Sequence, residues 1–358
     1  MRILYVTKAL NQEKKDGGNA VSIRNYEILK SLSKDTVIDL FEIEKPTRYT
    51  LLKNLLMLKS YGENKNIKKN FVQKLRNNYD FIFFNGSLYN TYEKLAYKQG
   101  IKTITFFHNI EKLYYQSRFK TERNFLSFVF SKYIAYIENK AVSFTDFCIV
   151  LNDRDNSDLE KQYKRDADLI LPISMPILDK SILNKTLNCS KKYCMFLGSN
   201  FFANQEGICW FIENVMPYVN IELHIVGSIC DFLENKYKNL KNVFLEGYVD
   251  DTAMWYNSAS YIVSPIFTGS GMKTKTIEAL SYGKLILGTD EAFVGIKQSD
   301  INNCGVVCNT ATDFIKQMNE QHLDKYFYQG SYNVFLQSFS DKVVIEKLKD
   351  FFNRIVIK

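Results

Sequence analysis

The sequence predicts an α/β protein made of two doubly wound parallel-sheet domains of similar size. Three observations support this fold class. Short apolar runs alternate with amphipathic helical patterns along the whole chain, as in parallel sheets covered by helices. The strand-like runs are apolar almost throughout, which is typical of strands buried on both faces. A length of 358 residues accommodates about two domains.

The expected strands fall into two groups, one in each half of the chain. In the first half they are Ile3–Thr7, Thr36–Phe41, Asp80–Phe84, Lys102–Phe107 and Phe147–Leu151. In the second half they are Tyr193–Leu197, Glu222–Val226, Val243–Leu245, Tyr261–Val263 and Leu285–Gly288. Helical spacing of apolar residues is clearest at Ala20–Leu32, Phe125–Val142, Gly207–Val215, Lys275–Tyr282 and Asp341–Ile355.

A break near residues 172–192 separates the two halves. Pro172 and Pro176 interrupt regular structure, and Asn184–Lys192 is polar. We therefore expect a first domain over residues 1–180 and a second over residues 181–340. In doubly wound sheets ligands bind at the carboxyl ends of the strands, so a ligand cleft lined by these ends is expected.

The charge is distributed unevenly between the halves. The chain has 47 basic and 39 acidic residues, a net charge of +8, of which residues 1–180 carry +9 and residues 181–358 carry −1. Residues 45–78 contain nine basic residues and one acid, Glu63, interspersed with leucines. This pattern fits an anionic membrane surface, and equally a solvated helix face packed on the core. Nucleic-acid binding is disfavoured because no recognition motif is present.

Targeting and redox signals are sparse. No run of 18 apolar residues and no signal-peptide pattern occurs, so we expect a cytoplasmic protein, with peripheral contact to the inner face of the plasma membrane as an option. The seven cysteines are expected to be reduced. A metal site is disfavoured, because there is no CxxC pair and there are only three histidines. Of these, His224 and His322 are interpreted as structural.

The most informative stretch is 265–289, PIFTGSGMKTKTIEALSYGKLILGT. An apolar strand leads into Gly269, Ser270 and Gly271, and a helix is expected to begin near Lys273. The amides and dipole at a helix start attract anions. Lys273 and Lys275 add positive charge to an end that the dipole already makes positive, which indicates a phosphate ligand.

Glu278 follows Lys275 by three residues, and two interpretations are open. The two side chains could form an ion pair on one helix face. Alternatively, Glu278 could accept hydrogen bonds from a sugar diol. His108 is similarly ambiguous: it ends an apolar strand, where a ligand-facing role and a structural role both fit.

The second half resembles the donor-binding domain of retaining GT-B glycosyltransferases of family 4, the group 1 glycosyl transferases. The match consists of a Gly-Ser-Gly loop, Lys273, Lys275, Glu278-Ala279 and a later Gly-Lys before an apolar strand. Further matching segments are 196–199 (FLGS), 210–212 (WFI), 224–227 (HIVG) and 248–251 (YVDD). Two departures stand out. Ser270 occupies the place of a first Glu found in many members, and residues 198–205 lack the usual Arg and Lys, so the cationic role falls to Lys273 and Lys275.

The resemblance implies a fold, a donor and a mechanism. The fold is GT-B, with a terminal helix, residues 341–358, that returns to the first domain. The donor is a nucleotide-diphosphate sugar, used as co-substrate without metal or cofactor, and the anomeric configuration is retained. Implied catalytic residues are His108, Lys273 and Lys275. Implied donor-binding residues are Gly17, Gly18, Gly198, Ser199, Asn200, Tyr248, Val249, Gly269, Ser270, Gly271, Met272, Lys273, Thr274, Lys275 and Glu278.

The function expected from these features is sugar transfer in bacterial surface polysaccharide assembly, capsule or O-antigen, on a lipid-linked glycan. Residues 45–78 would contact an anionic membrane. A protein glycosyltransferase, or a non-catalytic GT-B subunit that stabilises a partner, are the alternatives. A dinucleotide-dependent oxidoreductase is disfavoured because no GxGxxG follows the first strand.

Overall fold

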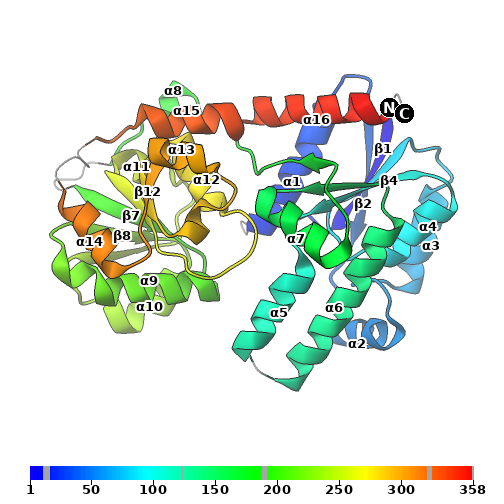
Figure 1. Ribbon diagram of the computed structural model, residues 1–358, viewed down its shortest axis with the longest axis horizontal. Helices are drawn as coiled ribbons and strands as arrows, with labels where there is room; N and C mark the ends of the chain where they lie inside the picture. Colours follow the sequence, from blue (N-terminus) through cyan, green and yellow to red (C-terminus); the bar gives the residue numbers. More distant parts are fainter. Residues whose placement is uncertain (11–16, 123, 188–191, 321–324, 357–358) are drawn as a thin grey trace. The chain divides into compact units, whose positions relative to one another are not determined.

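The computed structural model describes residues 1–10, 17–122, 124–187, 192–320 and 325–356 (Figure 1). The chain forms two compact units. The first comprises Met1–Pro172 together with Ile345–Lys358, and the second comprises Ile173–Val344. The chain thus leaves the first unit beside the proline break and returns to it within the last helical pattern.

The first unit is a doubly wound parallel sheet. Its strands are β1 (Arg2–Lys8), β2 (Val37–Ile43), β3 (Phe81–Phe84), β4 (Lys102–Phe107), β5 (Phe147–Val150) and β6 (Leu169–Ile170), in the order β2-β1-β3-β4-β5-β6. Its helices are α1 (Gly17–Lys30), α2 (Arg48–Met57), α3 (Lys65–Lys74), α4 (Asn90–Lys98), α5 (Glu111–Glu122), α6 (Phe125–Phe144), α7 (Asp153–Tyr163) and, from Ile345 onward, α16 (Asp341–Val356).

Aromatic side chains fill much of the first core. Phe71 of α3 packs edge-on against Phe41, with ring centroids 5.3 Å apart, and against Tyr92, at 5.0 Å. On α16, Phe352 packs edge-on against Phe81 of β3 at 5.6 Å, and Phe351 against Phe147 of β5 at 5.8 Å. The end of the chain therefore completes the core of the first unit.

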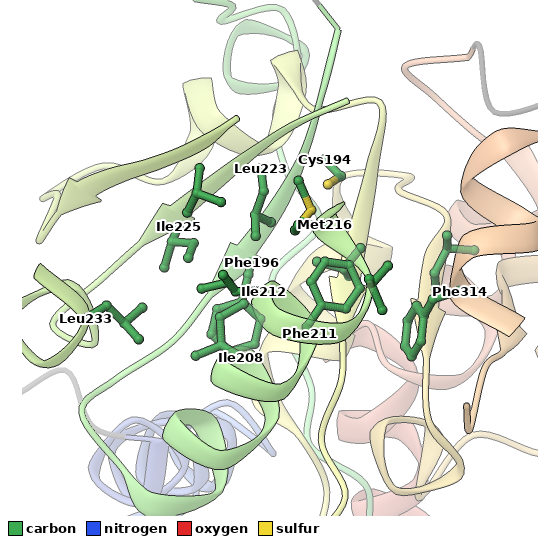
Figure 2. Packing of buried hydrophobic residues seen from close by; sticks show 14 of the residues in the cluster. Cys194, Phe196, Ile208, Phe211, Ile212, Met216, Leu223, Ile225, Leu233 and Phe314 are labelled. Atoms are coloured by element: carbon green, nitrogen blue, oxygen red, sulfur yellow. The ribbon is translucent and has the colours of Figure 1, made fainter. Parts of the chain in front are cut away.

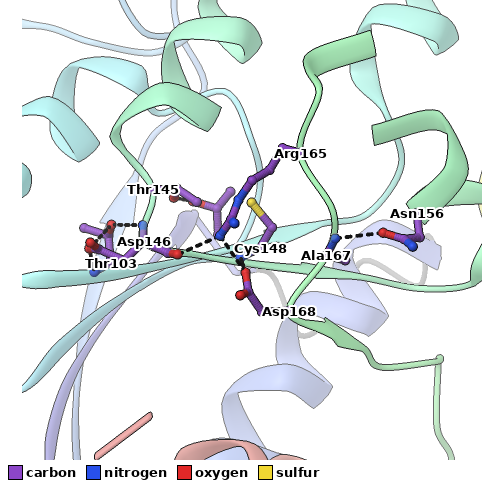
Figure 3. Close-up of polar contacts among 9 residues, drawn as sticks. Thr103, Thr145, Asp146, Cys148, Asn156, Arg165, Ala167 and Asp168 are labelled. Atoms are coloured by element: carbon purple, nitrogen blue, oxygen red, sulfur yellow. Dashed lines mark hydrogen bonds and ion pairs between the residues drawn. The ribbon is translucent and has the colours of Figure 1, made fainter. Parts of the chain in front are cut away.

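Polar contacts hold the amino ends of β4 and β5 (Figure 3). Thr103 donates from its backbone N–H to Asp146 Oδ2 at 2.7 Å, and Cys148 N–H donates to Asp168 Oδ2 at 2.8 Å. Arg165 bonds both the Asp168 carboxylate, at 2.7 Å, and the Asp146 carbonyl, at 2.8 Å. These contacts within the chain hold the amino-terminal ends of the two strands in place.

The second unit repeats the architecture. Its strands are β7 (Tyr193–Leu197), β8 (Glu222–Val226), β9 (Val243–Gly247), β10 (Tyr261–Ser264), β11 (Ile286–Gly288) and β12 (Gly305–Val307), all parallel, in the order β12-β11-β10-β7-β8-β9. Its helices are α8 (Lys180–Leu183), α9 (Phe202–Asn214), η1 (Met216–Tyr218), α10 (Cys230–Tyr237), α11 (Ala253–Ser258), α12 (Thr274–Ser281), η2 (Asp290–Phe293), α13 (Gln298–Cys304), α14 (Ala311–Asn319) and α15 (Gln329–Ser338).

Figure 2 shows part of the core of this unit. Phe196 of β7 and Ile225 of β8 are fully buried with Phe211 of α9. Phe314 of α14 packs edge-on against Phe211 with ring centroids 5.2 Å apart. The apolar strands and the apolar face of α9 thus form one continuous core, as burial of both sheet faces requires.

The predicted fold class is confirmed, and each of the ten predicted strands is present with ends shifted by up to two residues. Two short edge strands, β6 and β12, were not predicted. No helix in the described residues is long and apolar enough to cross a bilayer. Six cysteines are free thiols, whereas Cys189 and His322 lie outside the described residues.

Candidate functional site

The second sheet changes direction between β7 and β10. From β7 the chain moves outward to β8 and β9, and then crosses back to β10 on the other side. The loops that leave these two neighbouring strands therefore diverge, which opens a ligand-binding crevice at their carboxyl ends. The loops concerned begin at Gly198 and at Pro265.

The loop after β10 carries the predicted glycines. Gly269 has φ of 140° and Gly271 has φ of 63°, values that side chains rarely permit. The helix α12 begins at Thr274, and the side chain of its N-cap residue, Lys273, makes no capping hydrogen bond. An uncapped helix start at a switch point is suited to bind an anion through its backbone N–H groups and dipole.

Lys275 links the two loops. Its Nζ donates to Asn204 Oδ1 at 2.7 Å, and Asn204 Nδ2 donates in turn to the Ser199 carbonyl at 2.9 Å. The Lys275 ammonium also lies 4.2 Å from the ring centroid of Phe196. Burial, with a smaller contribution from the charge of Lys273, lowers the pKa of Lys275 to about 7. An anion placed here would raise that pKa again.

The sequence suggested that the charge of Lys273 would be available to a ligand, but the structure shows this side chain in contacts within the protein. Its Nζ forms an ion pair with Glu291 Oε1 at 2.7 Å and donates to the Gly271 carbonyl at 3.0 Å. Glu291 belongs to η2, which follows β11, the strand beside β10. The charge of Lys273 is thus already compensated, and its side chain fastens the glycine loop.

Glu278 does not pair with Lys275. Its Oε1 accepts a hydrogen bond from Thr252 Oγ1 at 3.0 Å, while Lys275 turns to Asn204. Burial raises the pKa of Glu278, and the bond from Thr252 acts in the opposite direction. Of the two interpretations left open by the spacing, the intrahelical ion pair is therefore not formed.

Gly207 fixes the distance between α9 and the loop after β10. A Cβ atom on Gly207 would lie 1.8 Å from the Pro265 carbonyl oxygen, far inside van der Waals contact. Only glycine allows this approach. Because Asn204 lies one turn earlier on α9, the close packing sets Asn204 opposite Lys275.

The other predicted donor-binding residues of this unit lie around the same loops, with one exception. In the loop after β7, the backbone N–H of Asn200 donates to Ser228 Oγ, which follows β8, at 3.1 Å. Met272 is buried and Ser270 half-buried beside the glycines. Tyr248 and Val249 instead follow β9, the edge strand, and Tyr248 is 59% exposed. The contact of Thr252 with Glu278 connects this segment to α12.

In the first unit the corresponding switch point lies between β1 and β3. Gly17 and Gly18, expected in a loop, instead form the first turn of α1. Asn85, directly after β3, donates to Thr7 Oγ1 at 3.2 Å and accepts from Asn25 at 2.9 Å.

His108 follows β4, the strand beside β3. Its ring centroid lies 5.1 Å from that of Phe106. Burial and the nearby charge of Lys8 lower the pKa of His108 to about 4. A hydrogen bond with the Asn85 backbone has a smaller effect in the opposite direction and raises this pKa. The imidazole is therefore neutral at physiological pH, so it can exchange hydrogen bonds but carries no charge.

No role was predicted from the sequence for three residues, two of which contact predicted site residues of the second unit and one of which lies near His108 in the chain of the first unit. Asn204 lies in the segment 198–205, which was noted only for its lack of Arg and Lys, Glu291 lies 18 residues from Lys273, and Glu111 follows His108 by three positions. Burial and the charge of Glu138 raise the pKa of Glu111 to about 8. No sequence pattern marks Glu291, and Asn204 does not stand out because it is one of three consecutive polar residues, 204–206, at the start of α9.

One comparison with known families covers the part of the chain that holds this candidate site. Residues 191–323 match the family described as Glycosyl transferases group 1. Residues 192–320 of the second unit are therefore similar to a group 1 glycosyl transferase domain. The switch-point loops, Lys275 and Glu278 all lie inside the matched range.

Three further similarities concern more of the chain. It is 22% identical over 238 residues to an uncharacterized 44.6 kDa protein in the cps region of Klebsiella pneumoniae. The match covers 60% of this chain and 58% of that relative, so the chain spans less than two thirds of the relative's length. The fold resembles Anabaena Alr3699/HepE in complex with UDP and glucose (TM-score 0.69, 11% identity, 99% of both chains). It also resembles sucrose-phosphate synthase from Thermosynechococcus elongatus (TM-score 0.75, 13% identity, 99% of both chains). These structures establish the GT-B fold.

Proposed function

We propose that the chain is a glycosyltransferase that moves a sugar from a nucleotide-diphosphate sugar to an acceptor hydroxyl. The observation that carries this proposal is the environment of Lys275. A half-buried lysine without a carboxylate partner among the described residues faces Asn204 beside an uncapped helix start. A buried cation is costly unless an anion compensates it. A diphosphate at the switch point supplies that anion.

The same groups suit the chemistry of the leaving group. Departure of a nucleoside diphosphate leaves negative charge on its terminal phosphate. Lys275 and the amides at the start of α12 are preorganised for that charge, and losing one such contact typically costs about 10²–10³ in rate. Lys273 acts with them by holding the glycine loop through Gly271 and Glu291. This charge stabilisation is proposed to operate without a metal ion or a cofactor.

We further propose that transfer retains the anomeric configuration, with the acceptor attacking on the face from which the diphosphate leaves. His108 would take part as a neutral hydrogen-bonding group, because its lowered pKa keeps it uncharged. Glu278 would accept hydrogen bonds from a diol of the donor. Tyr248 and Val249 would contact the base. The presence of UDP in the HepE complex favours a uridine nucleotide as the first donor to test.

The proposed acceptor is a lipid-linked glycan in bacterial surface polysaccharide assembly. The relative in the cps region of Klebsiella pneumoniae supports this assignment. So does the basic segment 45–78, which would bring the enzyme to the cytoplasmic face of an anionic membrane.

A screen of nucleotide sugars tests the proposal. Thermal shift and hydrolysis assays on the full chain with UDP-, GDP- and related sugars should single out one donor, whose binding Lys275→Met weakens. Absence of binding to every nucleotide sugar would refute the proposal. Binding without turnover on any glycan or peptide acceptor would instead favour a non-catalytic subunit.

A further inference from the structure

A second candidate site lies on the outer helices of the first unit. A cavity of about 490 Å³ is enclosed by side chains of α3, α4 and α6, which pack together, and by Leu58 at the end of α2. Its chemically distinctive lining residues are Lys68, Lys94, Lys98, Lys140, Tyr136 and Phe144. We call this cavity the lysine groove.

The lysine groove is strongly positive. Its four lysines come from three helices, and no carboxylate is among the lining residues. None of the four has an ion-pair partner among the described residues. Two of them are ordered by aromatic rings: Lys94 Nζ lies 5.8 Å from the Phe144 centroid, and Lys140 Nζ 5.9 Å from that of Tyr136. Such contacts hold the stems while the ammonium groups stay available to an anion.

A second hollow extends this charge. It has a volume of about 400 Å³ and is lined by Lys65, Lys68, Lys69, Val72, Gln73 and Arg76. Lys68 belongs to both cavities, so the two form one basic surface over α3. Lys94, Lys98 and Lys140 lie outside the basic segment 45–78, and only the fold brings them to it.

An exposed apolar stripe adjoins the lysine groove. On α2, Tyr49, Leu52 and Leu56 are 76%, 58% and 74% exposed, and their spacing of three and four residues places them on one side of the helix. The buried side of α2, opposite this stripe, carries Asn54, and Leu55 at the margin of the stripe packs on the α6 cluster around Tyr133. Leu58, at the end of α2, lines the groove itself.

We propose that the lysine groove binds the phosphate-bearing headgroup of an anionic lipid while the α2 stripe enters the boundary between headgroups and acyl chains. Positive charge beside exposed apolar side chains complements a bilayer surface, which offers phosphate and hydrocarbon together. A free phosphate compound would match the lysines and leave the stripe without a partner. The proposal extends the expected membrane contact of residues 45–78 to a defined headgroup site, and it does not depend on sugar transfer.

Vesicle binding by the full chain tests the groove directly. Co-sedimentation would compare vesicles of phosphatidylcholine alone with vesicles that also contain phosphatidylglycerol. The wild type should bind only the latter. The variant Lys94→Ala/Lys98→Ala/Lys140→Ala should bind about 100-fold more weakly, as expected for three lysines near an anionic surface. The matched control Lys238→Ala/Lys241→Ala/Lys316→Ala removes three exposed lysines of the second unit and should bind as the wild type does.

Two further experiments distinguish a lipid headgroup from a free phosphate compound as the ligand of the lysine groove. Leu52→Ser/Leu56→Ser should weaken vesicle binding at high salt, where surface charges are screened. Inorganic phosphate should fail to displace the protein at equal ionic strength. Equal losses in the groove variant and its control, or displacement by phosphate with no effect of the leucine variant, would overturn the proposal. Unchanged nucleotide binding in every variant verifies folding and keeps this outcome separate from that of the proposed function.

Discussion

Lys275 Nζ lies 2.7 Å from Asn204 Oδ1, and this bond ties the helix after β10 to the helix after β7. The two strands are neighbours at the point where the sheet reverses direction. Lys275 therefore holds together the two segments that would surround a diphosphate, one after each of these strands. Its charge, burial and hydrogen bond together explain why α12 begins with basic residues where its dipole opposes them.

Replacing Lys275 with methionine should weaken nucleotide binding at least tenfold, because hydrogen bonds to charged groups contribute about 1.5–3 kcal/mol. Glu278→Ala should also weaken binding, through loss of an acceptor for the donor diol. Titration calorimetry with UDP measures both effects, and Lys316→Ala, an exposed lysine on α14, serves as control. Wild-type affinity in both variants would remove α12 from the site.

Donor affinity should depend on pH through Lys275. In the free protein its pKa is about 7, and a bound diphosphate must raise that value. Affinity should therefore be constant below pH 7 and fall above it, by up to tenfold per pH unit. Calorimetry with a nucleotide sugar, whose phosphates do not titrate in this range, should also detect proton uptake on binding. The Lys275→Met variant should lose this dependence; a slope that persists in the variant would assign it to another group.

His108→Ala should lower turnover about 100-fold, the scale of a lost transition-state contact, with little change in nucleotide affinity. His108→Asn retains a neutral hydrogen-bonding group and should restore part of the activity, because the native imidazole is itself uncharged. Steady-state kinetics on the identified donor, beside calorimetry, separate the two effects. If turnover is unchanged in His108→Ala, the residue is structural.

Gly207→Ala should destabilise the second unit. In an ordinary helix interior this substitution stabilises by about 1 kcal/mol. Here the added Cβ would meet the Pro265 carbonyl at 1.8 Å, and relieving such overpacking typically costs about 1–3 kcal/mol. Urea unfolding should show the loss, together with weaker nucleotide binding as Asn204 moves away from Lys275. A gain in stability would mean that the loop yields without cost.

The contrast between sequence and structure has a physical basis. Short apolar runs between polar residues, such as Phe81–Phe84, predict strands because their length and flanks fit a strand that is buried on both faces. Strands as short as Leu169–Ile170 leave no such pattern. At the candidate site, the sequence predicted roles for the glycine loop, Lys275 and Glu278, but not the residues that contact them. The pairing of Lys273 with Glu291 depends on two loops that meet only in the folded sheet, and spacing alone could not decide between Asn204 and Glu278 as the partner of Lys275.

The discontinuity of the first unit has a consequence for synthesis on the ribosome. Phe351 and Phe352 complete its core, yet they are made after every residue of the second unit, Ile173–Val344. Multidomain chains generally fold from the amino terminus as they emerge. Here Phe81 and Phe147 cannot be covered by α16 until the whole second unit has been synthesised. We therefore expect the first unit to be most prone to aggregation during synthesis, before α16 has been made.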